Sequence, residues 1–141
     1  MGQFFYFLHA IGAVGMGIYL VLPFLVGRIT QLSSEGQSGF ADGLLIANRV
    51  AQFCLLLQLL TGGYMMTMGT EYSVLWSTLT LVLFLGIGAL SGIMAKPLKA
   101  IVAAAKAGES AAGSISRVRL FSTLLFVLYV AIIFVMQYSH I

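Results

Sequence analysis

The chain has 141 residues, of which 60% are apolar and 8% are charged, and its mean hydropathy is +1.04. Because about a quarter of the residues in a soluble domain are charged, this composition excludes a soluble globular domain, a disordered tail and a nucleic-acid-binding module. The net charge is only +3, and the single cysteine, Cys54, excludes a disulfide framework and a thiolate zinc site. We therefore predict one transmembrane domain covering residues 1–141.

Four apolar stretches are long enough to cross a membrane as helices, which takes about 20 residues. They cover residues 4–26, 44–68, 74–95 and 120–138, with connecting loops at 27–43 and 96–119. The stretches are continuous, unlike the alternating segments of a membrane β-barrel, and the first lacks the basic start of a signal peptide. We predict an all-α fold, an integral membrane antiparallel four-helix bundle.

The basic residues predict how this bundle is oriented. All seven lie in the loops 27–43 and 96–119 or at the start of the second span: Arg28, Arg49, Lys96, Lys99, Lys106, Arg117 and Arg119. By the positive-inside rule both loops are cytoplasmic, and the N- and C-termini lie on the outer face, most simply of a bacterial cytoplasmic membrane. Aromatic residues agree, since five of them mark the outer boundary: Tyr6, Tyr64, Tyr72, Trp76 and Tyr138.

The two loops differ in composition. Residues 31–43 are rich in Ser, Gly and Gln, which predicts a flexible connection. Residues 96–119 open with a proline and then become rich in alanine. This second segment is either a solvated basic loop or a short helix at the membrane surface, with Lys99 and Lys106 facing anionic headgroups.

Small residues predict where the helices approach one another closely, because lipid gives helices no hydrophobic reason to associate. The candidates are Gly12, Gly15, Gly62, Gly88 and Gly92. Gly88 and Gly92 form a GxxxG pair, which serves either packing within the chain or association with a second copy. The expected partners are therefore the lipid bilayer and either a second copy or a membrane-complex subunit.

Polar side chains inside an apolar span are costly, so they mark candidate sites. His9, about two turns into the first span, is the leading candidate, since a neutral imidazole in a bundle ligates haem iron or copper. The alternative is a histidine that only hydrogen-bonds to a neighbouring helix. His140 returns to the same face and is a second candidate haem ligand. Arg49 either snorkels to the boundary or pairs with a haem propionate or a lipid phosphate.

Methionines give a second pattern near His9. Four of them fall at the outer ends of the second and fourth spans: Met65, Met66, Met68 and Met136. Thioethers together with an imidazole suit Cu(I), although methionine also fills gaps in apolar cores. The sequence contains no nucleophile–base pair, phosphate loop or metalloprotease motif, so any redox chemistry belongs to a bound cofactor and enzymatic activity stays open.

Three segments resemble the small membrane proteins of the CopD-like and HemJ-like group: FFYFLHAIGAVGMGIYLVLPFLVGR, NRVAQFCLLLQLLTGGYMM and VLWSTLTLVLFLGIGALSG followed by KPLKAI. The shared features are a first-helix histidine, here His9, and the glycine positions. The HemJ-like resemblance implies haem-dependent protoporphyrinogen oxidation, with a lysine early in the third helix that this chain replaces with Trp76, Ser77 and Thr78. The CopD-like resemblance implies copper handling across the membrane.

Three functions are therefore carried forward. The first is binding of haem b near the outer face, for electron transfer or porphyrin-related redox chemistry. The second is copper transport or homeostasis through the outer His and Met layer. The third is a cofactor-free accessory or self-associating membrane subunit, packed through Gly88 and Gly92.

Overall fold

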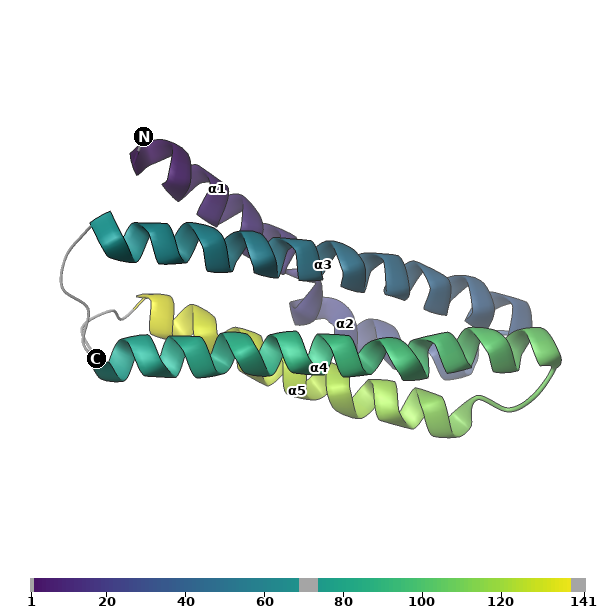
Figure 1. The fold of residues 1–141 in the computed structure, drawn as a ribbon. Coiled ribbons are helices and arrows are strands. Elements are labelled where there is room, and N and C mark those ends of the chain that lie inside the picture. Colours follow the sequence, from purple (N-terminus) through teal and green to yellow (C-terminus); the bar gives the residue numbers. More distant parts are fainter. Residues whose placement is uncertain (1, 69–73, 138–141) are drawn as a thin grey trace.

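The computed structural model describes residues 2–68 and 74–137, and all regular structure in these ranges is helical (Figure 1). The elements are α1 (Gly2–Gly15), α2 (Ile18–Val26), a 3-10 turn at Ile29–Gln31, α3 (Ser34–Met68), α4 (Val74–Ala107) and α5 (Ala112–Gln137). Four helical segments are long and apolar enough to cross a membrane, with α1 and α2 together forming the first. The predicted all-α fold with four apolar helices is confirmed.

The first span is two helices rather than the single helix predicted for residues 4–26. Between α1 and α2 the backbone forms a turn with hydrogen bonds between residues three positions apart. Gly17 N donates to Val14 O (2.9 Å), and Tyr19 N donates to Met16 O (3.1 Å). A Cβ at Gly17 would lie 2.8 Å from Val14 O, so only glycine fits this turn. The break lets α1 cross α3 at an angle while α2 runs behind α3 and α4 (Figure 1).

The predicted loop at 27–43 is wrong over most of its length, because α3 already begins at Ser34. Ser33 caps this helix by accepting a hydrogen bond from Gly36 N at 3.2 Å. The Gln37 side chain donates to Ile29 O at 3.1 Å and to Leu32 O at 3.3 Å, which ties the preceding turn to the helix. These local bonds outweigh the flexible composition of the segment.

The predicted loop at 96–119 is also mostly helical, since α4 runs to Ala107 and α5 begins at Ala112. Alanine has the highest helix propensity, so the alanine-rich segment continues α4 instead of forming a separate surface helix. The helix ends at Gly108, whose φ of +72° is the left-handed conformation typical of a helix end. Glu109 N then bonds to Ala104 O at 2.8 Å and closes the last turn.

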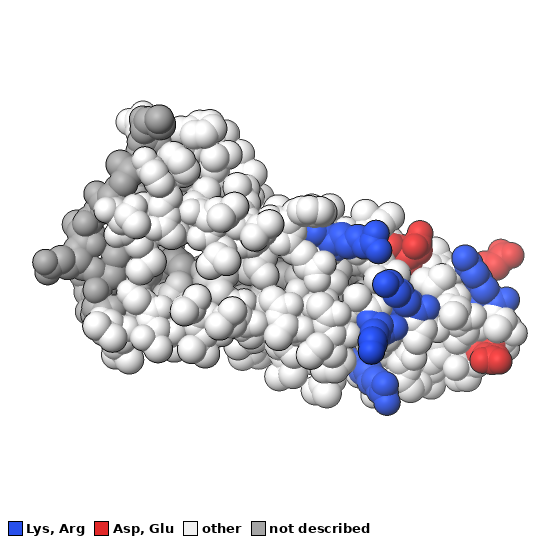
Figure 2. All heavy atoms as spheres, viewed as in Figure 1, with Lys and Arg blue, Asp and Glu red and all other residues white. Residues whose placement is uncertain are grey.

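The charged residues gather at one end of the bundle, toward the turn between α4 and α5, and the other described residues on the visible face carry no charge (Figure 2). From Arg49 to Met68, α3 rises roughly 29 Å, and α4 rises roughly 33 Å from Val74 to Lys96. Both lengths match a hydrocarbon core of about 30 Å. In both α3 and α4, a segment as long as the membrane is thick is thus joined at one end to a helical extension that carries charged residues.

Glycines allow the closest helix contacts. A Cβ at Gly12 would overlap the Gln58 side chain, and a Cβ at Gly15 would overlap Cys54 Sγ, so α1 packs directly on α3 at these positions. Gly88 of α4 faces Leu55 of α3, with 3.3 Å between a Cβ built there and Leu55 Cδ2. A Cβ at Gly92 meets no atom of the described residues within 4 Å.

Candidate functional site

A cavity of about 420 Å³ lies beside His9 among α1, α3, α4 and α5. Gln58, Gly62 and Met66 line it from α3, Trp76, Thr80 and Phe84 from α4, and Met136 from α5. Its lining is predominantly apolar, and the exposed side chains of Leu59 and Leu81 border its opening. Sites for organic ligands have volumes of roughly 300–1,000 Å³, so the cavity has the size of such a site.

His9 is held in a defined orientation by Thr61 of α3. Its Nδ1 atom lies 2.8 Å from Thr61 Oγ1. The Thr61 hydroxyl carries one proton and donates it to Leu57 O at 2.7 Å, so it accepts from Nδ1–H. This arrangement assigns the Nδ1–H tautomer and leaves the Nε2 lone pair available to a ligand. Gly62 lies against the ring, with 3.4 Å between a Cβ built there and His9 Cε1.

Two buried polar atoms of the cavity wall have no hydrogen-bond partner in the part of the chain that the structure describes. They are Oε1 of Gln58 and Oγ1 of Thr80. Their residues are only 6% and 8% exposed. A buried polar atom without a partner costs about 1–3 kcal/mol, so each of the two atoms is a candidate for a hydrogen bond to a bound water or ligand. Gln58 Oε1 lies in the contact between α3 and α1, against Gly12.

The methionine pattern is partly visible in this cavity. Met66 and Met136 line it together with His9. The side chains of Met65 and Met68 lie outside the part that the structure describes, as do Tyr72, Tyr138 and His140. Within residues 2–68 and 74–137, no group of three or more His, Cys, Asp or Glu side chains is arranged to hold a metal. Any metal held by these residues therefore uses one imidazole and thioethers.

Arg49 does not line the cavity beside His9. It borders a separate depression in the surface of α3 together with Gln52, Phe53 and Leu56. Cys54 packs against Gly15 between α1 and α3, also away from the His9 cavity. The structure thus brings together His9, Met66 and Met136 but leaves Arg49 outside this group.

Sequence reasoning missed the polar partners around the candidate residues. Thr61 bonds to His9 and Thr80 lines the cavity, and their place inside two predicted spans was the available signal. A second buried group joins α2, α3 and α4: Tyr19 Oη donates to Asn48 Oδ1 at 3.3 Å, and Asn48 Nδ2 donates to Ser91 O at 2.9 Å. Because Tyr19, Asn48 and Ser91 are all buried between the helices, we assign this second group to the stability of the bundle.

Aromatic residues complete the wall and the rim of the cavity. Trp76 Nε1 donates to Val135 O at 2.8 Å, which joins α4 to α5. Phe5 and Tyr64 stack with ring centroids 3.8 Å apart, which joins the start of α1 to the end of α3. All four spans are therefore connected around the candidate site.

Comparison of the chain with family models, with curated proteins and with solved structures finds no match.

Proposed function

We propose that the cavity beside His9 binds haem b, with His9 Nε2 as an axial ligand of the iron. The hydrogen bond between His9 and Thr61 is the observation that carries this proposal, because it presents a bare imidazole nitrogen to the ligand. The cavity volume of about 420 Å³ favours an organic cofactor over a bare metal ion. Met66 and Met136 are candidates for the second axial position.

Haem supplies one-electron redox chemistry when bound, and the protein supplies its position and surroundings. Thr61 fixes the imidazole ring, since rotation of the ring would break the bond at Nδ1. The apolar side chains of Leu59, Leu81 and Phe84 line the cavity and would exclude water from the haem ring. The Thr80 hydroxyl would pair with a polar group of the ligand, whereas Gln58 Oε1 lies against Gly12 of α1.

We further propose that the protein lies in a bacterial cytoplasmic membrane with its basic end inside the cell. The concentration of Lys and Arg at one end supports this orientation (Figure 2). His9 lies in the uncharged part of the bundle, so the haem site is near the outer face. Electron transfer, or porphyrin-related redox chemistry, then occurs on the outer side of the membrane.

Haem content tests the proposal. The protein, expressed with haem precursor and purified in mild detergent, is expected to contain about one haem per chain, measured as the pyridine complex. His9→Ala is expected to lose most of it, whereas Tyr6→Ala, an exposed position one turn away on the same helix, retains it. Native protein without haem after reconstitution would overturn the proposal.

Cu(I) binding is the second candidate, favoured by the presence of both thioethers in the cavity with His9. In this case Met66→Leu combined with Met136→Leu removes copper binding, measured by competition with a Cu(I) chelator. Met16→Leu is the matched control, since Met16 is buried elsewhere in the core. Unchanged copper affinity in the double variant would reject the thioether site.

A further inference from the structure

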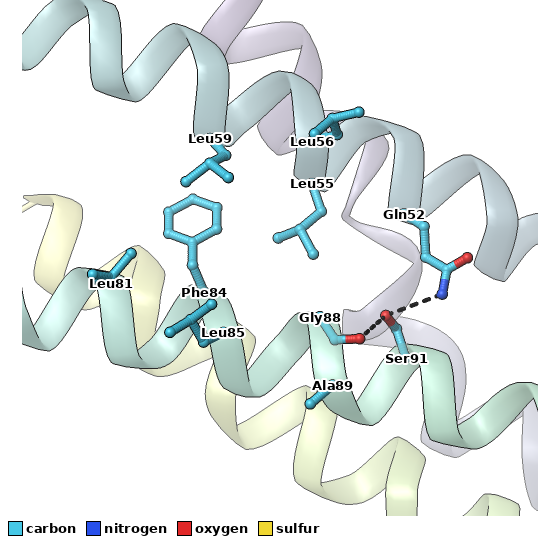
Figure 3. Close-up of a pocket in the computed structure, with 10 residues that line it drawn as sticks. All are labelled: Gln52, Leu55, Leu56, Leu59, Leu81, Phe84, Leu85, Gly88, Ala89 and Ser91. Carbon is cyan, nitrogen blue, oxygen red and sulfur yellow. Dashed lines mark hydrogen bonds between the residues drawn. The ribbon is translucent and has the colours of Figure 1, made fainter.

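A groove between α3 and α4 runs along the membrane-spanning part of the molecule (Figure 3). Leu55 and Leu59 of α3 and Phe84 of α4 point toward one another across it. Leu56, Leu85 and Ala89 also line the groove, whose volume is about 420 Å³. Gly88 contributes no side chain, and Leu55 packs against its backbone, with 3.3 Å between a Cβ built at Gly88 and Leu55 Cδ2. The exposed fractions of Leu56 and Leu85 are 53% and 64%, so an apolar surface is open to the lipid side.

The groove continues toward the charged end of the bundle. The depression at Arg49 has a volume of about 480 Å³ and shares Gln52 and Leu56 with the groove. Gln52 Nε2 donates to Ser91 Oγ at 3.4 Å, which joins the two helices where the apolar part ends. The groove and the depression thus form one continuous surface. Its lining changes from apolar to polar and then to cationic toward the charged end of the bundle.

Arg49 lines the polar end of this groove, and the seven-residue spacing places a second cation, Lys96, on the groove face of α4. Arg49 precedes Leu56 by two helical turns in α3, and Lys96 follows Ala89 by two turns in α4. Residues seven positions apart lie on nearly the same face of a helix, so Lys96 is on the groove face of α4. Both side chains are exposed, and no hydrogen bond or ion pair joins either of them to another of the described residues.

Two acidic residues, Glu35 and Asp42, lie on the same face of α3, and neither makes an ion pair with Arg49 or Lys96 among the described residues. Asp42 precedes Arg49 by two turns, which places it roughly 10 Å farther along the helix and away from the membrane. Arg49 and Lys96 stand where the uncharged helix of membrane thickness ends, which is the depth of lipid phosphates.

We propose that this groove binds one anionic phospholipid, with its phosphate between Arg49 and Lys96 and one acyl chain along Leu56 and Ala89. The match is one of charge and depth together: two unpaired cations at the phosphate level and an open apolar channel directly below them. Neither cation lines the cavity beside His9, so the phosphate site is separate from that cavity, whereas the apolar part of the groove adjoins it through Leu59, Leu81 and Phe84.

Native mass spectrometry of the full chain in mild detergent tests this proposal, with phosphatidylglycerol and phosphatidylcholine of identical acyl chains as probes. Phosphatidylglycerol is expected to stay bound and phosphatidylcholine to be lost. Arg49→Gln and Lys96→Gln each weaken phosphatidylglycerol binding about fivefold. Ala89→Phe, which fills the groove with both charges intact, also weakens binding, and Arg49→Lys restores most of it relative to Arg49→Gln.

Arg117→Gln is the matched control, since it removes an exposed cation of α5 that does not line the groove. Equal retention of the two lipids by the native protein would overturn the proposal without any variant. An equal loss in Arg117→Gln and Arg49→Gln would also overturn it, because general surface charge would then account for the binding.

Discussion

The imidazole Nδ1 of His9 in α1 lies 2.8 Å from the hydroxyl oxygen of Thr61 in α3, and this contact connects residues that are 52 positions apart in the chain. The Thr61 hydroxyl in turn donates to the carbonyl of Leu57 in its own helix. The result is a histidine whose tautomer and ring orientation are determined by a neighbouring helix. A hydrogen bond to the ring nitrogen that does not bind the metal is typical of histidines that ligate metal ions.

Thr61→Val tests this support. The substitution keeps the shape of the side chain but removes the acceptor for His9 Nδ1–H, so the ring gains freedom and the other tautomer becomes accessible. Cofactor affinity is expected to fall about 10-fold or more, measured by titration of the cofactor-free protein with haemin. Thr61→Ser keeps the hydroxyl and is expected to keep the affinity, and equal loss in both variants would contradict a role for the hydrogen bond.

Thr80→Val separates ligand binding from folding. In the protein without ligand, Thr80 Oγ1 is buried and has no partner among residues 2–68 and 74–137, so its removal is expected to leave the free energy of unfolding unchanged or to raise it by about 1 kcal/mol. With ligand present, the same variant is expected to bind more weakly. Unfolding in SDS with and without haem measures both effects, and a large loss of stability in the ligand-free variant would contradict this assignment.

Gly15→Val tests the close approach of α1 and α3. The added side chain would overlap Cys54, so α1 must shift, at a cost of about 1–3 kcal/mol in the free energy of unfolding. Cofactor binding is expected to fall as well, because α1 carries His9. Gly92→Ala is the control, since a Cβ at that position meets no described atom within 4 Å. Equal effects of the two variants on SDS unfolding would argue against the contact.

Asn48→Leu tests the second buried polar group. The substitution leaves Tyr19 Oη and Ser91 O without their partner, and interhelical hydrogen bonds in membranes contribute about 0.6 kcal/mol on average and up to about 1.7 kcal/mol. We expect a loss in this range in the free energy of SDS unfolding, with unchanged cofactor affinity. A variant that folds normally but loses the cofactor would show that this group belongs to the site.

Much of the fold could be predicted because membrane helices need long apolar stretches, and four of them are plain in the sequence. The turn at Gly17 could not be predicted from hydropathy, since both sides of it are equally apolar. The helical residues 34–43 were missed because their composition favours a loop, whereas Ser33 and Gln37 stabilise the helix through specific side-chain bonds. Composition gives only the average tendency of a segment to form a helix or a loop. In this segment the side-chain hydrogen bonds of Ser33 and Gln37 determine that the helix forms.

The candidate site shows the same division. His9 was found because a histidine in an apolar span is costly, and this argument needs no knowledge of its neighbours. Thr61 and Thr80 were missed because threonine is common in membrane helices and is important here only through the register between helices. That register places Thr61 opposite His9 and Thr80 in the same cavity, and it follows from packing at Gly12 and Gly15 that no local pattern specifies.

The most direct test of the haem site is the visible absorption spectrum of the purified protein after haem supplementation, recorded beside His9→Ala and Tyr6→Ala. The account predicts a Soret band in the native protein and in Tyr6→Ala, and its loss or a large shift in His9→Ala. A native spectrum without a Soret band, or a band that His9→Ala leaves unchanged, would contradict the central claim that His9 ligates haem in this cavity.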